Sequence, residues 1–577
     1  MNGLKINQYE FNDEGKLNLS NVDKGKDWPV VYLIHNDKEL YVGETQNIYK
    51  RVEQHLKNKD RKNLKLIKII FDDEFNKSAA LDIEQSLIQL FNADNKYKLQ
   101  NLNGGQSEKH NYFQREKYLN KLDSIWDILT KNGMTNMTLD AVRNTDLFKY
   151  SPYNTLTNEQ NEACKIILYD IMRKLSTNTE GTSILKGSAG TGKTIVLINM
   201  IYKLINANKF EIDFSDDDSL TDNNQFIHDF KIFYDNFKKE HNRELKIGYV
   251  VPMTSIRKTI QTVFSKTKNG LKSSLVIGPF DVFKDEYDIL FIDEGHRLCK
   301  YKNISYRGPY RKCAEKMGKD PNDVTSLDMI MANSKYRVIV YDESQTVKGS
   351  DITHEEFLKS FDAYNEPMWV GLTTQMRCKG GTDYIDYLAN IFKCIQYKKL
   401  DMINYEFKIF NDVDVMVTKI KELDKMYGLC RNAAGYSWKW ISNECKSYEE
   451  AIANGLEDIR IGDYKYVWNM TNQEFILSNN SINEIGCIHT LQGYDLNYVG
   501  VILGEEIDYN PVTNKIEVDL NKFYDKYVKQ DTDEELVREY IINSYKVIMS
   551  RGIKGCFLYA CNKNMRDYLA RFVEKGD

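Results

Sequence analysis

The chain has 577 residues, which at roughly 100–200 residues per domain is enough for three or four domains. Hydrophobic residues make up 42% and charged residues 28%, as in ordinary globular proteins, and the net charge of -5 excludes an overall basic field, so nucleic acid would have to bind at local basic patches. The ten cysteines form no CxxC pair and no apolar run approaches the roughly 18 residues of a membrane span, so we expect reduced thiols, no membrane association and a cytoplasmic location.

The first 106 residues predict a polar leader followed by a small α+β unit. Residues 1–27 are polar, with scattered Gly, Asn and Asp. From Trp28 onward, two short apolar runs flank a polar turn at 35–38, which is typical of a β-hairpin. A helix, a strand and a second helix follow, until the sequence NLNGG interrupts the pattern. The expected elements are strands 30–34 and 40–43, helix 46–57, strand 64–71 and helix 78–92, within a domain of residues 28–106.

The rest of the chain predicts a connector and then an α/β region. Residues 107–155 are polar and mixed in character, and we expect a mostly helical connector. From residue 156 short apolar strands alternate with helical stretches, which is typical of parallel sheets with helices on both faces. The expected strands are 183–186, 247–251, 289–292, 337–341 and 498–503.

Residues 187–194 read GSAGTGKT between an apolar strand and the start of an apolar helix. Glycines in such a loop let backbone N–H groups cradle phosphate oxygens, and the helix N-terminus adds its positive dipole end. We expect Lys193 to reach the β and γ phosphates of ATP and Thr194 to place its hydroxyl on Mg²⁺. The expected phosphate-binding glycines are Gly187, Gly190 and Gly192.

A second apolar strand, 289–292, runs directly into two carboxylates. We expect Asp293 to bind Mg²⁺ through water and Glu294 to polarise the water that attacks the γ-phosphate. Behind a phosphate-binding loop, this pair predicts hydrolysis of ATP rather than binding alone.

Further polar residues follow in the order expected of a two-lobed nucleic-acid motor. Gln160 precedes the phosphate-binding loop, where a glutamine commonly reads adenine, and Asp342 and Gln345 follow another strand, where they would sense the γ-phosphate. An arginine finger stabilises the charge on the transferring phosphoryl group, and in two-lobed motors it comes from the second lobe. The finger candidates are Arg377 and Arg551, and Gln492 and Gly493 complete the predicted nucleotide-binding set.

Residues 155–565 resemble a superfamily 1 helicase core, and more narrowly the Schlafen group 3 type helicase domain of bacterial and phage proteins. The sequences VVPMTSIRKTI, DEGHRL, AGYSWKW and HTLQGYDLNYVGVILG carry this resemblance. It implies two RecA-like lobes with parallel sheets, at 156–370 and 371–577. Tyr341 stands where superfamily 1 helicases usually place Gly before the Asp, so the resemblance supports ATP hydrolysis more directly than strand separation.

The small N-terminal domain resembles a GIY-YIG nuclease. Val30-Val31-Tyr32 corresponds to the first motif, with Val30 in the place of its Gly, and Tyr41-Val42-Gly43 corresponds to the second. The ordered residues that complete the resemblance are Arg51, His55, Glu84 and either Asn101 or Asn103.

This resemblance implies a metal-dependent cleavage of phosphodiesters. It places the general base on Tyr32 or Tyr41, and it makes Glu84 the single protein ligand to Mg²⁺ or Mn²⁺, since hard cations take carboxylate oxygens and keep waters. Arg51 would neutralise the scissile phosphate. A local basic stripe beside this site suits a phosphate backbone, and its members are Lys50, Arg51, Lys57, Lys59, Arg61, Lys62, Lys65 and Lys68.

The leading hypothesis is therefore an ATP-dependent DNA helicase or translocase fused to a DNA endonuclease, in defence against phage or in DNA repair. The expected partner is single-stranded or forked DNA, with RNA as an alternative, and a homo-oligomer or a defence-system partner protein is compatible with the sequence. Two alternatives stay open. The ATPase is a nucleotide switch that gates the nuclease or assembly without translocation, or the motor is active and the GIY-YIG domain only binds DNA.

Overall fold

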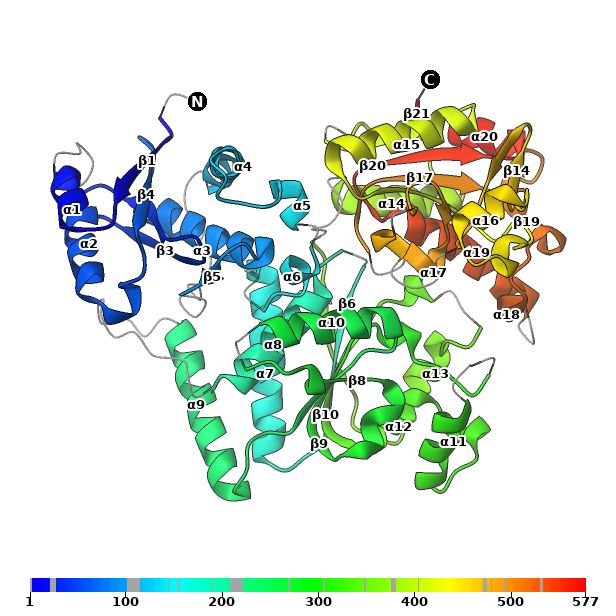
Figure 1. Ribbon diagram of the computed structural model, residues 1–577. Helices are drawn as coiled ribbons and strands as arrows, with labels where there is room; N and C mark the ends of the chain where they lie inside the picture. Colours follow the sequence, from blue (N-terminus) through cyan, green and yellow to red (C-terminus); the bar gives the residue numbers. More distant parts are fainter. Residues whose placement is uncertain are drawn as a thin grey trace. The chain divides into compact units, whose positions relative to one another are not determined.

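The computed structural model describes residues 3–20, 27–100, 115–143, 145–152, 154, 156–188, 190–207, 222–267, 270–302, 304, 307–346, 349–374, 380–402, 404–470, 475–478, 480–491, 494–529 and 533–576. The chain forms two compact units (Figure 1). The N-terminal unit comprises Met1–Asn161 with Val263–Leu271, and the C-terminal unit comprises Glu162–Thr262 with Lys272–Asp577. Within the described ranges, every helix is too short or too polar to traverse a lipid bilayer.

The N-terminal unit is built on a five-stranded sheet with the order β1-β4-β2-β3-β5. The hairpin expected around the turn at 35–38 is present, because β2 pairs antiparallel with β3. Residues 5–10, inside the expected polar leader, form a strand paired antiparallel with β4, so this part of the leader belongs to the sheet. The strands are β1 (Lys5–Glu10), β2 (Val30–His35), β3 (Glu39–Thr45), β4 (Leu66–Phe71) and β5 (Lys98–Leu99). The helices are α1 (Asp13–Ser20), α2 (Ile48–Lys57), α3 (Lys77–Asp94), α4 (Arg115–Lys131), α5 (Leu139–Arg143) and α6 (Asp146–Lys149), with a short 3-10 helix η1 (Lys59–Arg61).

Strand β2 is buried on both faces, which explains its unbroken apolar run. Successive side chains of a strand point to opposite faces. Val31 and Leu33 join the cluster that includes α3 and α4, whereas Tyr32 and Ile34 join the cluster on the side of α2. The sheet therefore places Tyr32 inside the molecule, facing α2.

Helices α4 to α6, which lie in the expected connector, pack on α3. Trp126 of α4 has no exposed surface, and its ring centroid lies 5.1 Å from that of Phe91 on α3. The carboxylate of Asp94, at the end of α3, accepts hydrogen bonds from the backbone N–H groups of Asn136 and Met137. The described part of the connector is thus an integral part of the N-terminal core.

The C-terminal unit contains two six-stranded sheets, and every strand pairing within each of them is parallel. This confirms the expected α/β class with two RecA-like lobes (Figure 1). The first sheet has the order β11-β6-β10-β9-β7-β8, with β6 (Gly181–Gly187), β7 (Ile247–Val250), β8 (Val276–Ile277), β9 (Tyr287–Ile292), β10 (Ser334–Tyr341) and β11 (Met368–Leu372). The second has the order β16-β13-β17-β20-β12-β21, with β12 (Glu406–Ile409), β13 (Cys430–Ala434), β16 (Ile485–Gly486), β17 (Leu496–Leu503), β20 (Gly552–Ala560) and β21 (Glu574–Lys575).

Helices and two small hairpins complete the C-terminal unit. Because β11 ends at Leu372, the first sheet extends two residues past the expected lobe boundary at 370. The helices of the first lobe are α7 (Asn158–Ser176), α8 (Lys193–Ile205), α9 (Asp222–His241), α10 (Thr254–Lys266), α11 (Arg307–Lys316), α12 (Ser326–Ala332) and α13 (His354–Lys359). Those of the second are α14 (Gly381–Phe392), α15 (Val413–Tyr427), α16 (Tyr448–Ala453), α17 (Ile488–Leu491), α18 (Lys526–Lys529), α19 (Glu534–Met549) and α20 (Lys563–Leu569). The hairpins pair β14 (Ile459–Ile461) with β15 (Tyr464–Tyr466) and β18 (Ile507–Asn510) with β19 (Lys515–Val518).

Candidate nuclease and ATPase sites

The N-terminal candidate site is centred on the Tyr32 hydroxyl. Arg51 and His55 lie four residues apart on α2, so both side chains project from the same face of the helix. The Tyr32 hydroxyl lies 2.7 Å from Nε2 of His55, and Nε of Arg51 donates a hydrogen bond of 3.2 Å to the same hydroxyl. The sheet and one helix thus bring three of the predicted catalytic residues into direct contact.

Gly43 is required where the two tyrosines of this site meet. The centroids of the Tyr32 and Tyr41 rings lie 6.1 Å apart, with 29° between the ring planes. A Cβ atom at position 43 would lie 2.4 Å from the Tyr32 hydroxyl and 2.9 Å from the Tyr41 ring, both closer than atoms can approach. The glycine of the Tyr-Val-Gly motif therefore provides the space that the two rings occupy.

A pair of carboxylates lies in the same domain. Burial and the negative charge of Glu44 raise the pKa of Glu84 to about 7, although Arg51 and the backbone N–H of Glu44 act in the opposite direction. Burial also raises the pKa of Glu44, against the positive charges of Lys77 and Arg51. Glu84 lies on α3 and Glu44 on β3, so the fold forces together two like charges that are distant in the sequence.

These carboxylates fit a hard divalent cation. Oε2 of Glu44 is buried without a hydrogen-bond partner, and a cation would satisfy it. Within the described ranges, no group of three or more His, Cys, Asp or Glu side chains surrounds a common point. The Glu44 and Glu84 carboxylates suit Mg²⁺ or Mn²⁺, because Mg²⁺ commonly binds through one or two carboxylates and water. Asn101 and Asn103 lie outside the described residues.

The phosphate-binding loop of the C-terminal unit has the backbone that its glycines predict. Gly190 and Gly192 have φ values of 88° and 80°, in the left-handed region that favours glycine. A Cβ at Gly187 would lie 2.7 Å from Oγ1 of Thr191. Lys193 begins α8, and its ammonium donates to the carbonyl oxygens of Gly187 and Ser188 at 2.6 and 2.8 Å. The ammonium is thereby held at the loop that would receive the phosphates.

Thr194 and Asp293 meet at the end of the phosphate-binding loop. The Thr194 hydroxyl donates to Oδ2 of Asp293 at 2.9 Å, and the Tyr249 hydroxyl donates to the same oxygen at 2.9 Å. Burial and the charge of Glu294 raise the pKa of Asp293 to about 6. A buried carboxylate beside a hydroxyl provides the oxygen ligands that Mg²⁺ prefers, so the residues present fit the predicted Mg²⁺ site.

Glu294 is held in an uncommon conformation beside a buried histidine. Its φ of 49° lies in the left-handed region, which costs energy for a residue other than glycine. Nε2 of His296 lies 2.9 Å from Oε2 of Glu294, and His296 has no exposed surface. Burial alone would raise the pKa of Glu294, but His296, Lys193 and Arg551 outweigh it and lower the pKa, so the carboxylate stays ionised.

A series of polar contacts joins the two lobes of the C-terminal unit. Nζ of Lys193 lies 3.5 Å from Oδ2 of Asp342, which accepts a hydrogen bond of 2.6 Å from Nε2 of Gln345. Nη2 of Arg551 then donates to Oε1 of Gln345 at 3.3 Å. Arg551 is buried and lies between α19 and β20 in the second lobe, and Gln345 follows β10 in the first. The second lobe thus delivers an arginine to the candidate ATPase site.

The remaining predicted residues fall elsewhere or are not described. Gln160, on the first turn of α7, caps that helix. Its Oε1 accepts from the Thr157 N–H at 3.0 Å, and its own N–H donates to Oγ1 of Thr157 at 3.2 Å. Its contact with adenine stays a prediction. Arg377, Gln492 and Gly493 lie outside the described residues.

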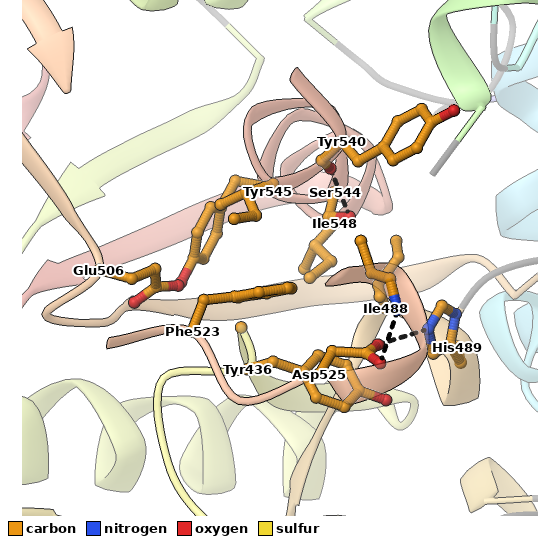
Figure 2. A pocket seen from close by; sticks show the side chains of 13 residues that line it. Tyr436, Ile488, His489, Glu506, Phe523, Asp525, Tyr540, Ser544, Tyr545 and Ile548 are labelled. Carbon is orange, nitrogen blue, oxygen red and sulfur yellow. Dashed lines mark hydrogen bonds and ion pairs between the residues drawn. The ribbon is translucent and has the colours of Figure 1, made fainter. Parts of the chain in front are cut away.

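A small cavity lies beside α17, the short helix that precedes Gln492. Helix α17 carries His489, whose Nε2 lies 3.8 Å from Oδ2 of Asp525 (Figure 2). The cavity beside this pair is about 20 Å³, room for about one water molecule and far too small for a nucleotide. Glu506 at its far end is buried, which raises its pKa, and it accepts a hydrogen bond from the Tyr545 hydroxyl. One of these contacts joins α17 to the residue before α18, and the other joins α19 to the segment after β17.

Comparison with known families agrees with this geometry. A model of the Schlafen group 3, DNA/RNA helicase domain matches residues 181–562, about two thirds of the chain. The chain belongs to this helicase family. A model of the GIY-YIG catalytic domain matches residues 29–98, so a GIY-YIG domain precedes the helicase domain.

Individual relatives are distant. The Saccharomyces cerevisiae protein named Uncharacterized protein YPL245W is 25% identical over 425 residues, which cover 68% of this chain and 84% of the relative. The Pif1 helicase of Candida albicans is 11% identical with a TM-score of 0.24, over 72% of this chain and 97% of that structure. A Bacteroides Pif1 bound to ssDNA is 11% identical with a TM-score of 0.23, over 72% of this chain and 94% of that structure.

The structure adds residues that sequence reasoning did not single out. In the Schlafen group 3 helicase domain these are Tyr249, which donates to Asp293, and His296, which contacts Glu294. In the GIY-YIG domain they are Glu44 and the contacts of Arg61 described below. The motif DEGH includes His296, and the position of Glu44 directly after Tyr-Val-Gly was a usable signal. Nothing local in the sequence marks Tyr249.

Proposed function

We propose that this protein is an ATP-driven DNA translocase whose GIY-YIG domain cuts the DNA that the motor handles, with Mg²⁺ at both sites. The observation that carries the proposal is the contact between Arg551 of the second lobe and Gln345 of the first. An arginine that reaches the site only when the lobes are together couples lobe closure to hydrolysis, which a simple nucleotide-binding domain does not need.

In the ATPase site, each residue has a distinct task. Lys193 and the glycine loop bind the β and γ phosphates, and Thr194 with Asp293 would hold Mg²⁺, which neutralises the developing charge when bound. Glu294, kept ionised by its neighbours, orients and polarises the attacking water through its negative charge. Arg551 stabilises the charge on the transferring phosphoryl group, and Gln345 positions Arg551 through its side-chain carbonyl.

In the nuclease site, the geometry favours Tyr32 over Tyr41 as the general base. Burial and the neighbouring Tyr41 raise the pKa of Tyr32, so the residue stays a phenol at neutral pH. A phenol can take a proton from water only if it passes its own proton on, and Nε2 of His55 at 2.7 Å is the acceptor. The resulting hydroxide attacks phosphorus, the P–O bond to the leaving oxygen breaks, and that oxygen takes up a proton from solvent. Arg51 stabilises the phosphorane-like transition state, and Glu84 would hold the Mg²⁺ that would polarise the phosphoryl group as a Lewis acid.

Separate variants test the two activities. ATP turnover and DNA cleavage are measured with ATP, Mg²⁺ and Mn²⁺ in all combinations, on single-stranded, duplex and forked DNA. Lys193→Ala should abolish ATP turnover, and Glu84→Gln should abolish cleavage while leaving turnover intact. Undiminished turnover in Lys193→Ala would refute the motor. Equal cleavage by wild type and Glu84→Gln would remove Glu84 from the mechanism.

The same assays separate the alternative functions. ATP turnover that single-stranded DNA fails to stimulate would favour a nucleotide switch that gates the nuclease. Stimulated turnover without cleavage under any metal would favour a GIY-YIG domain that only binds DNA. As the biological setting we propose defence against phage DNA, with DNA repair as the alternative. Plaque formation on cells that carry wild type or Glu84→Gln decides between them, because only defence predicts a loss of protection.

A further inference from the structure

Arg61 contacts two side chains of the nuclease site. One is His55, the proposed acceptor of the Tyr32 proton, and the other is Tyr41. Arg61 lies on the short helix η1, directly after α2. Its Nη1 lies 3.0 Å from Nε2 of His55, and its guanidinium carbon lies 3.6 Å from the centre of the Tyr41 ring. Arg61 thus contacts both His55 and Tyr41, the two residues whose rings lie next to that of Tyr32.

The contact with Arg61 fixes the hydrogen-bonding state of His55. An arginine side chain has only donors, so Nε2 of His55 must present its lone pair and the ring hydrogen lies on Nδ1. The Tyr32 hydroxyl approaches the same nitrogen and must therefore also donate. Two donors share a single lone pair, and the proton transfer from Tyr32 to His55 competes with Arg61 for it.

The Tyr32 and His55 side chains are also closed to solvent. Tyr32 has no exposed surface and His55 is 4% exposed. A water molecule can act on Tyr32 only after a covering side chain moves, and long charged side chains move at the least cost. Arg61 is suited to move, because its partners here are an aromatic ring and a neutral imidazole, and no carboxylate among the described residues pairs with it.

A phosphate oxygen is a stronger partner for Arg61 than either of these. The phosphate oxygen carries a negative charge, which the neutral imidazole and the aromatic ring lack, and a planar guanidinium binds phosphate through two parallel N–H···O bonds. Exposed lysines lie close to Arg61 in the chain, at positions 57, 59 and 62, and their charges would attract a nucleic-acid backbone.

We propose that Arg61 is a phosphate-responsive latch: its contact with His55 keeps the Tyr32–His55 pair closed, and a phosphodiester of the substrate draws it away. Release of Arg61 frees the Nε2 lone pair for the Tyr32 proton and opens a path for water. Cleavage then begins only where a backbone phosphate occupies the site. This inference rests on the proposed nuclease function, but its first test does not require cleavage.

The test measures how fast diethyl pyrocarbonate modifies His55 in the full chain, by mass spectrometry of its peptide. Arg61→Met keeps the length of the side chain and removes its donors and charge. We expect His55 to react at least about fivefold faster in Arg61→Met than in wild type. Lys59→Met, which removes a charge from the same short helix, should leave the rate unchanged. Equal rates at His55 in wild type and Arg61→Met would overturn the latch.

Two further measurements exclude a loss of fold and connect the latch to phosphate. His35, buried in the same domain, should keep its rate in Arg61→Met. If His35 also reacts faster, the domain has opened and the second measurement decides. In wild type, inorganic phosphate at constant ionic strength should accelerate modification of His55 in a saturable way. No acceleration would overturn the proposal, whereas failure of the nuclease function would appear as absent DNA cleavage with the modification results intact.

Discussion

Replacing Glu84 by Gln should make the N-terminal unit more stable at alkaline pH, although it removes the predicted metal ligand. In the folded protein, burial and the charge of Glu44 raise the pKa of Glu84 from its ordinary 4.5 to about 7. The folded state therefore binds this proton more tightly than the unfolded state does. Stability from the protonated carboxyl is present at acid pH and is lost as the pH rises through 7. The glutamine side chain of the Glu84→Gln variant does not ionise, so the variant should escape this loss.

The size of the effect follows from the shift in pKa. A change from 4.5 to about 7, at about 1.36 kcal/mol per unit, corresponds to about 3 kcal/mol. About 2 kcal/mol of this loss of wild-type stability should occur between pH 5 and pH 8, because the unfolded state has already begun to ionise Glu84 below pH 5. Relative to wild type, the free energy of unfolding of Glu84→Gln should therefore rise by about 2 kcal/mol over this interval.

Hydrogen exchange of peptides from α3 and β3 measures this difference, with wild type and variant compared at the same pH in EDTA. Glu53→Gln is the control, because Glu53 is a half-exposed carboxylate whose pKa its lysine partners lower. This variant should therefore gain no stability over wild type at pH 8. Adding Mg²⁺ should stabilise wild type and not Glu84→Gln, since only wild type keeps both carboxylates. The difference in free energy of unfolding between Glu84→Gln and wild type should grow from pH 5 to pH 8. A constant difference would refute the pKa argument.

Three further substitutions test the packing and the lobe contact. Arg551→Ala should lower kcat for ATP by about 10³-fold at unchanged ATP binding, measured by coupled turnover and nucleotide titration, because the finger acts only in the transition state. Gly43→Ala should lower the free energy of unfolding by about 1–3 kcal/mol and abolish cleavage, since its Cβ would overlap Tyr32. Hydrogen exchange of β2 and a DNA cleavage assay measure the two effects. Trp126→Ala should destabilise the N-terminal unit by about 3–5 kcal/mol, measured by exchange of α3.

Each of these expectations has a contrary outcome. Full turnover by Arg551→Ala would mean that the contact with Gln345 holds the lobes together without serving catalysis. Wild-type cleavage by Gly43→Ala would show that the two tyrosine rings can separate without loss of the site. Unchanged exchange of α3 in Trp126→Ala would mean that α4 is not part of the N-terminal core.

The sequence by itself determined the parts of this protein that depend on neighbouring residues. The phosphate-binding loop is local, because a strand, a glycine turn and a helix N-terminus follow one another along the chain, and the two described φ values agree with it. The hairpin around 35–38 and the pairing of Arg51 with His55 on one helix face are local in the same sense. Arg377, Gln492 and Asn101 remain predictions.

Only the tertiary structure decided which distant residues meet. Glu44 shifts the pKa of Glu84 from another element, and Arg551 reaches Gln345 across more than two hundred residues of chain. Neither spacing nor composition encodes such pairs, because sheet order and lobe packing, not sequence separation, set the distances. Arg61 shows the same limit. In the sequence it is one of eight basic residues in a stripe, and only the tertiary structure reveals its contacts with His55 and Tyr41.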